Sequence, residues 1–168
     1  MNTSELLIEL FDRIPPLVRE AVDGLDTDAL CAVPAGQANP VGWLVWHLTR
    51  VQDDHIADIV EQPQLWATGD WAPRFGLAPD PSNTGYGHGP SDVGAVRPES
   101  AEALIAYHDA VASRTREFLE TVTDAELDRI VDERWNPPVT LGVRLLSVAD
   151  DDLQHAGQAV YLRGVLEA

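Results

Sequence analysis

The sequence contains no lysine, and its 11 basic residues, all arginines, are scattered singly among 28 acidic residues. The formal net charge is therefore −17 at pH 7. A surface that binds nucleic acid or an anionic membrane needs clustered cations to neutralise phosphates. This composition argues against both kinds of partner, and we expect a small-molecule substrate instead.

Cysteine is nearly absent, because Cys31 is the only one. A single cysteine forms no internal disulfide and cannot build a thiolate metal cage. Cys31 stands in the apolar stretch DALCAVP, a setting that raises the pKa of a thiol. We expect Cys31 to be a small filler of the core rather than a reactive group.

Long apolar runs are also missing, since no segment approaches the roughly 20 apolar residues that cross a membrane. The first residues, MNTSELLIELFDRIPP, place no apolar run behind a basic region, so we expect no signal peptide. With 168 residues, 45% hydrophobic and 23% charged, the composition is that of a globular protein. We predict one cytoplasmic domain spanning residues 1–168.

Apolar residues recur at spacings of three and four, which is typical of amphipathic helices. The pattern covers residues 4–23, 41–62, 99–122 and a last segment from 140 almost to the C-terminus. Pro15 and Pro16 predict a kink or break in the first helix. Asn39 is a candidate N-cap of the second helix, with Pro40 at its first position. Four such segments without alternating strand patterns predict an all-α fold, a four-helix bundle.

The chain between the second and third helices, residues 62–98, is rich in proline and glycine and has no sustained period. A loop of this length in a compact domain is often a lid or a binding loop. Pro98 is expected to open the third helix. Thr123 and Glu126 form a capping-box pattern for a short helix ending at Val131, and Thr140 is expected to cap the last helix.

Polar residues interrupt the inner apolar stripe of the last helix at Asp151 or Asp152 and at His155. Asp151 and His155 are four residues apart, so they lie about 6 Å apart along the axis and point the same way. A carboxylate and an imidazole at this spacing can bind one metal ion. His47, on the inner side of the second helix, is the best third ligand. Three protein ligands and one open position are typical of a catalytic site.

Plainer interpretations of the same residues exist. A buried histidine is often only hydrogen-bonded, an Asp/His pair can be a weak helix pair, and the acidic run 150–152 can be a solvated face. Among the other histidines, His55 projects only loosely with His47, His88 belongs to a flexible loop, and His108 suits the core or its rim. Asp54 is better placed than His55 to line the same cavity as His47.

The segments WLVWHLTRVQDDHIAD (residues 43–58) and DDDLQHAGQAVYLRG (residues 150–164) resemble the DinB-like superfamily. Within it the chain is similar to the branch near the mycothiol-dependent maleylpyruvate isomerases and related thiol S-transferases. The resemblance covers nearly the whole chain. It implies a four-helix bundle that holds a divalent metal near its centre, zinc in the first place and nickel as the alternative.

Carried over residue by residue, the resemblance implies metal ligation by His47, Asp151 and His155. Related isomerases carry Glu at the position of Asp151, and many other members carry His. Asp152 is the alternative ligand if the register differs. Asp54 and Gln158 are then groups that orient a ligand or substrate, and the long loop, with Trp71, Tyr86 and His88, covers the open coordination position.

The implied activity is that of a divalent-metal-dependent S-transferase, which uses a low-molecular-weight thiol such as mycothiol as cosubstrate on an electrophilic small molecule. A second hypothesis is a non-catalytic small-molecule-binding or stress-response domain with a degraded metal site. A third is a structural protein that forms a homodimer through an exposed apolar patch.

Overall fold

The computed structural model describes residues 1–33 and 39–167. Its elements in chain order are α1 (Thr3–Phe11), α2 (Ile14–Val22), α3 (Thr27–Cys31), α4 (Val41–Ile59), α5 (Leu65–Thr68), η2 (Ala72–Phe75), α6 (Pro90–Ala95), α7 (Ala101–Leu119), η3 (Asp124–Glu126), β1 (Ile130–Asp132), β2 (Val139–Thr140) and α8 (Leu141–Leu166). The prediction of an all-α fold is confirmed, with one very small two-stranded sheet added to it.

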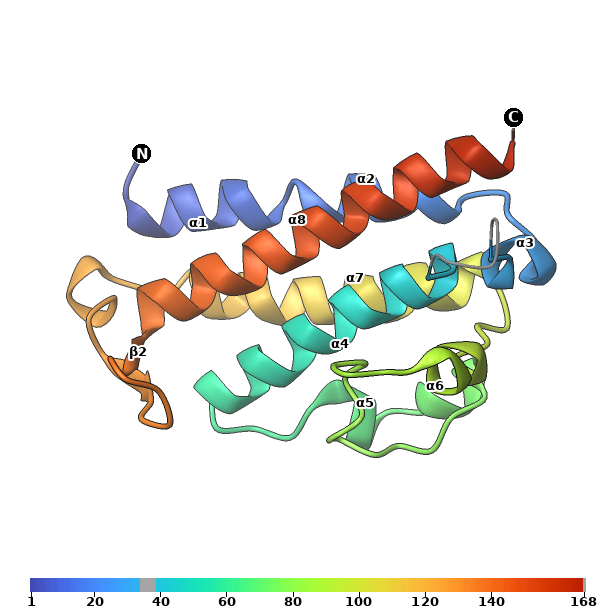
Figure 1. Ribbon diagram of the computed structural model, residues 1–168. Coiled ribbons are helices and arrows are strands. Elements are labelled where there is room, and N and C mark those ends of the chain that lie inside the picture. The colour runs from blue at the N-terminus through green and yellow to red at the C-terminus, as the bar shows by residue number, and fades with distance from the viewer. Residues whose placement is uncertain (34–38, 168) are drawn as a thin grey trace.

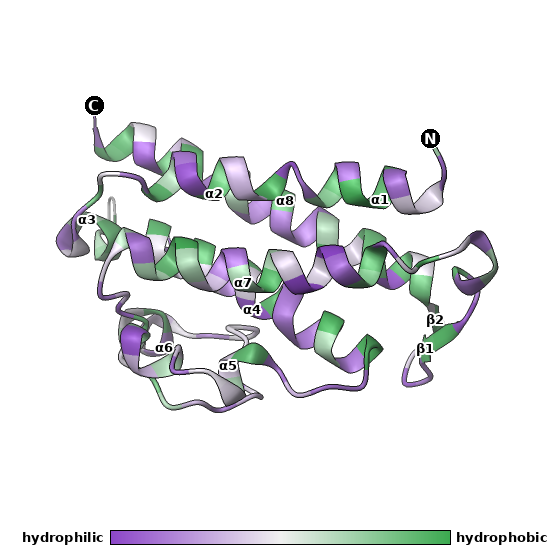
Figure 2. Cartoon of the chain, turned by 180° about the vertical axis from the view of Figure 1, so that it is seen from behind, coloured by the Kyte–Doolittle hydropathy of each residue, from purple (hydrophilic) through white to green (hydrophobic). Residues whose placement is uncertain are grey.

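The long helices pack lengthwise on one another around a shared apolar core (Figure 1). Both α4 and α2 contact α8 on one side and α7 on the other. Helices α4 and α8 run antiparallel, because His55 lies beside Arg144 near the start of α8 while His47 lies beside His155 further along it. Hydrophobic and hydrophilic stretches follow one another along the long helices (Figure 2), as expected when apolar residues recur every three or four positions. Within residues 1–33 and 39–167, no helix combines the length and apolar character needed to cross a membrane.

The predicted break near Pro15 and Pro16 is confirmed, because α1 ends at Phe11 and α2 begins at Ile14. Both prolines lie in the first turn of α2, where the missing N–H groups have no helical partner to lose. The predicted start of the second helix was wrong by one position. Pro40 is itself the N-cap residue of α4, and its side chain makes no capping hydrogen bond.

The third helix also begins later than predicted. Ser100 caps it and accepts a hydrogen bond from the backbone N–H of Ala103, so Pro98 lies before the cap. The capping box of Thr123 and Glu126 is confirmed, but it leads only to the short turn η3.

The expected helix up to Val131 was wrong, since the chain forms strand β1 and returns antiparallel as β2. A capping box satisfies the N–H groups of one turn and does not extend a helix by itself. The segment Trp135–Pro138 cannot continue a helix, so the chain turns back there. Backbone hydrogen bonds from Leu141 to Arg129 and from Gly142 to Leu127 then close the hairpin against α8. The Thr140 cap of α8 is confirmed.

Candidate metal centre

Two imidazoles and one carboxylate converge between α4 and α8. His47 lies in the middle of α4, and Asp151 and His155 lie one turn apart on α8. Each residue offers one ligand atom, and these atoms all lie within 4.8 Å of one another. The Nε2 atom of His155 lies 3.7 Å from Oδ1 of Asp151. Donors around a tetrahedral zinc ion, each about 2.1 Å from it, are about 3.4 Å apart. Small side-chain rotations therefore suffice for all three groups to share one cation.

The ring orientation of both histidines is set by hydrogen bonds on the nitrogen that would not ligate. Nδ1 of His47 donates to the backbone carbonyl of Thr84 at 2.6 Å. Nδ1 of His155 faces Oε1 of Gln158 at 3.0 Å. A carbonyl oxygen only accepts, so in both rings Nδ1 carries a proton and Nε2 is the nitrogen left to face a metal. Metal-binding histidines are commonly oriented in this way. Burial lowers the pKa of His47, which keeps its imidazole in the neutral form that binds metal.

The carboxylate of Asp151 also suits a cation. Its Oδ2 atom is buried and has no hydrogen-bond partner within the described parts of the chain. Buried polar atoms are almost always partnered, because leaving one unpaired costs about 1–3 kcal/mol. A cation between Asp151 and the two imidazoles would provide the missing partner.

The alternative ligand, Asp152, lies outside the cluster. Its side chain is fully buried on the core-facing stripe of α8, alongside Val148 and Ala156, whereas Asp151 is half-buried on the neighbouring face. Burial raises the pKa of Asp152 well above its ordinary value, which favours the uncharged acid. The geometry thus brings Asp151, and not Asp152, to the two histidines.

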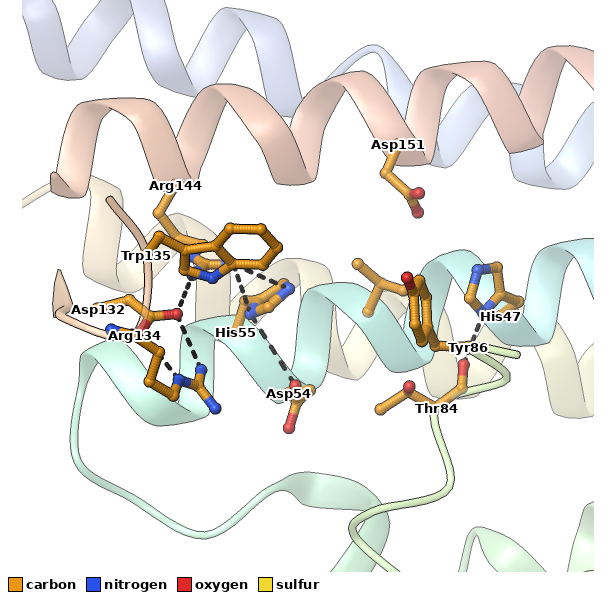
Figure 3. A pocket seen from close by; sticks show the side chains of 11 residues that line it. His47, Asp54, His55, Thr84, Tyr86, Asp132, Arg134, Trp135, Arg144 and Asp151 are labelled. Carbon is orange, nitrogen blue, oxygen red and sulfur yellow. Dashed lines mark hydrogen bonds and ion pairs between the residues drawn. The ribbon is translucent and has the colours of Figure 1, made fainter. Parts of the chain in front are cut away.

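A cavity of about 630 Å³ extends from this cluster along the groove between α4 and α8 (Figure 3). Such a volume suits a small-molecule ligand. The residues that line it are His47, Val51, Asp54, His55, Thr84, Tyr86, Asp132, Arg134, Trp135, Arg144 and Asp151. In Figure 3, His47 and Asp151 lie at one end, and Trp135, Arg144 and His55 gather at the other.

Two arginines share one carboxylate at the end of the cavity away from His47. Asp132 accepts hydrogen bonds from the backbone and guanidinium of Arg134, and from Nη2 of Arg144 at 2.7 Å. The hydrogen bonds from Arg134 hold the pKa of Asp132 well below its ordinary range. None of these residues was singled out from the sequence, because the hairpin that presents Asp132 and Arg134 was predicted to be partly helical.

Both Asp54 and His55 line the cavity that His47 also lines. For Asp54 this position was predicted from the sequence. Oδ1 of Asp54 accepts a hydrogen bond from Nε2 of Gln64 at 2.6 Å, and burial raises the pKa of Asp54. His55 does not reach the metal cluster. Nη1 of Arg144 lies 3.5 Å from Nδ1 and 3.4 Å from Nε2 of His55. The guanidinium of Arg144 therefore lies against the His55 ring, at the end of the cavity away from the metal cluster.

The remaining predicted residues have other roles. His88 accepts a hydrogen bond from Nε1 of Trp43 at its Nδ1 and faces Oδ1 of Asn83 with its Nε2, so it anchors the loop. His108 is buried in the core. Trp71 packs on Tyr107 and is not among the residues lining the cavity. Of the three loop residues predicted to cover the open position, only Tyr86 lines the cavity.

The loop segment that carries Thr84 is fastened to α4 by Arg50, whose side chain is fully buried. Its guanidinium donates to the carbonyls of Pro81 at 3.0 Å and Asn83 at 3.1 Å. Asn83 directly precedes Thr84, whose carbonyl holds His47. The next residue, Gly85, has a φ of +93°, and a Cβ atom there would lie 2.6 Å from Nδ1 of His47. Only glycine allows this close approach of the loop to the ring.

The fold and this cluster define a class: helical proteins with a candidate divalent-metal site of two histidines and a carboxylate between antiparallel helices. The family model of the DinB superfamily matches residues 10–159. The chain therefore belongs to the DinB superfamily. It is similar to a crystal structure of a conserved protein from Enterococcus faecalis, with 30% sequence identity and a TM-score of 0.88 over 97% of this chain and 96% of that one. No curated protein matches the sequence.

Proposed function

We propose that the protein is a divalent-metal-dependent S-transferase that joins a low-molecular-weight thiol, such as mycothiol, to an electrophilic small molecule. The observation that carries this proposal is the pair of imidazoles with Nδ1 occupied and Nε2 available beside Oδ2 of Asp151, which has no hydrogen-bond partner among the residues that the structure describes. Membership of the DinB superfamily supports it, because metal binding is common in that superfamily.

In this proposal His47 and His155 supply neutral imidazole ligands and Asp151 supplies the negative charge. Such nitrogen and oxygen donors suit zinc, with nickel as the alternative. The metal, when bound, lowers the pKa of a coordinated thiol and so stabilises its thiolate near neutral pH. Thr84 and Gln158 accept hydrogen bonds from Nδ1 of the two rings, which leaves Nε2 as the ligating nitrogen. Asp54, whose pKa is raised by burial, is suited to accept a proton in the same cavity.

The protein's only thiol is poorly placed to be the nucleophile. Cys31 lines a different cavity, beside Asn39 and Arg97, and burial raises the pKa of its thiol. A thiol with a raised pKa holds little thiolate at neutral pH. The nucleophilic sulfur is therefore best supplied by a cosubstrate.

A non-catalytic small-molecule-binding domain is the second candidate function. The observation that favours it is the spacing of the ligand atoms, up to 4.8 Å, which is wider than a bound zinc ion requires. A protein that binds a ligand in the cavity without taking up metal would fit this second candidate.

Metal content separates the two candidates. We expect the purified protein to take up one zinc or nickel ion per chain, and His47→Ala and His155→Ala each to abolish stoichiometric uptake while helix content is kept. His108→Gln is the matched control, because His108 is buried in the core and lies outside the cluster. Full occupancy in either cluster variant would place the metal elsewhere, and wild-type protein without zinc or nickel affinity would favour the binding domain. Thiol transfer is then measured with glutathione, cysteine and N-acetylcysteine against a panel of electrophiles.

A further inference from the structure

We propose that the cavity beside the metal cluster binds a planar, conjugated electrophile through the exposed aromatic rings of Tyr86, near its His47 end, and Trp135, at its other end. The binding claim stands on the geometry of the cavity alone. The reactivity of the bound ring rests on the proposed transferase function.

Exposed aromatic side chains collect at this cavity. In the described part of the chain, the large aromatic residues classed as exposed are Tyr86 at 93%, Tyr161 at 76% and Trp135 at 65%. Two of these three line the same cavity, although they come from different loops. Aromatic surface left in water at the edge of a cavity is typical of a binding site, because burying it against a ligand is favourable.

The position of Trp135 is set by the charged groups around it. Arg134, the preceding residue, is bound to Asp132 through its backbone N–H at 3.0 Å and through its guanidinium at 2.9 Å. Asp132 is in turn bound to Arg144 of α8. The hairpin is therefore tied to α8, and the backbone position from which Trp135 projects is fixed before any ligand arrives. A preorganised group loses little conformational freedom on binding.

Two more side chains with planar groups lie near Trp135. Nη1 of Arg144 lies 3.4 Å from Nε2 of His55, and both residues line the cavity. Planar cations and aromatic rings favour stacking with conjugated rings. Val51 adds an aliphatic side chain to the lining. A flat ring thus meets complementary surfaces here, whereas a puckered saturated ring of similar size does not.

The corresponding reaction is nucleophilic aromatic substitution, and 1-chloro-2,4-dinitrobenzene is a suitable probe. The sulfur of the thiol forms a bond to the chlorinated carbon, and the carbon–chlorine bond breaks with its electron pair leaving as chloride. The proton of the thiol passes to a side chain that lines the cavity or to water. No oxidant or reductant is needed.

The test is a calorimetric binding titration. The full-length protein, incubated with zinc, is titrated with the 2,4-dinitrophenyl conjugate of N-acetylcysteine. We expect Trp135→Ala to bind about 5-fold more weakly and Tyr86→Ala about 3-fold more weakly, from the size of aromatic stacking effects. Trp135→Phe keeps a flat ring and is expected to stay within 2-fold of wild type. Tyr161→Ala is the matched control and is expected to bind like wild type, because Tyr161 is exposed but does not line the cavity.

The saturated S-cyclohexyl conjugate of N-acetylcysteine distinguishes planarity from general apolar contact. We expect its affinity to change little in Trp135→Ala. The proposal is overturned if both alanine variants bind the dinitrophenyl conjugate like wild type, or if both conjugates weaken equally. If the binding pattern holds but no thiol reacts with 1-chloro-2,4-dinitrobenzene, the ring site stands and the transferase function fails. If both alanine variants bind the dinitrophenyl conjugate like wild type and also react at the wild-type rate, the transferase stands and the ring site is overturned.

Discussion

The replacement Arg50→Met tests whether the loop that holds His47 depends on a single buried guanidinium. Arg50 donates to the carbonyls of Pro81 and Asn83, and to Oε1 of Gln64 at 2.7 Å. Methionine fills much of the same space but donates no hydrogen bond, so the carbonyls beside Thr84 lose their anchor. We expect the Thr84 carbonyl to shift and the hydrogen bond to Nδ1 of His47 to weaken.

The magnitude follows from what Arg50 contacts. It is fully buried and forms an ion pair with Asp53 at 3.4 Å. Breaking one side of a buried ion pair typically costs about 3–5 kcal/mol of folding free energy. Loss of a group that orients a metal ligand typically weakens metal binding about 10- to 100-fold. We therefore expect Arg50→Met to be less stable and, while still folded, to bind zinc at least about 10-fold more weakly.

Zinc affinity is measured by competition with a chromophoric chelator, at a temperature where circular dichroism shows the variant to be folded. Nitrogen NMR of the His47 ring reports whether the proton stays on Nδ1. Arg114→Met is the matched control: Arg114 donates to the carbonyl of Pro63 at 2.8 Å, at the other end of the same loop. A folded Arg50→Met that binds zinc like wild type would refute the reasoning.

Should Arg50→Met be too unstable, Gly85→Ala tests the same contact. Its methyl group would lie 2.6 Å from Nδ1 of His47 at a φ of +93°. We expect this variant to fold, since Gly85 lies in a loop, and to bind zinc at least about 10-fold more weakly. Gly87→Ala also has a positive φ but meets nothing within 4 Å, which makes it the control for backbone strain alone. Equal zinc affinity in the two glycine variants would contradict the expected role of the loop.

Two further predictions concern acidic and basic groups. Asp151→Asn is expected to weaken zinc binding more than about 10-fold, whereas Asp152→Asn, buried and outside the cluster, is expected to change it less than about 3-fold; the reverse order in chelator competition would make Asp152 the ligand. Burial lowers the pKa of His108 to about 4, with Asp109 raising and Arg19 further lowering it. The unfolded chain takes up this proton first as the pH falls, so about 3 kcal/mol of unfolding free energy is lost between pH 6.5 and 4. Denaturant titrations at several pH values should show a smaller loss of unfolding free energy in His108→Gln. If the unfolding free energy of this variant falls with pH as steeply as that of wild type, the loss does not come from His108.

Much of the helical framework could be predicted, because helix boundaries depend on neighbouring residues. Apolar spacing at three and four predicted the long helices, and prolines 15 and 16 predicted the break between α1 and α2. The cap at Thr140 needs only its own side chain and the N–H of Val143. The hairpin was missed because a strand pair depends on a partner that is distant in sequence, and local capping signals carry no information about it.

The sequence by itself also determined that Asp151 and His155 share one face of a helix, since four residues make about one helical turn. Only the tertiary structure decided that this face meets His47, that Asp152 points into the core, and that Arg144 reaches Asp132 at one end of the cavity. The physical reason is that helix periodicity orients a side chain about its own axis. The groups it meets are set by how helices and loops pack, and long side chains such as Arg50 and Arg144 can reach several of them.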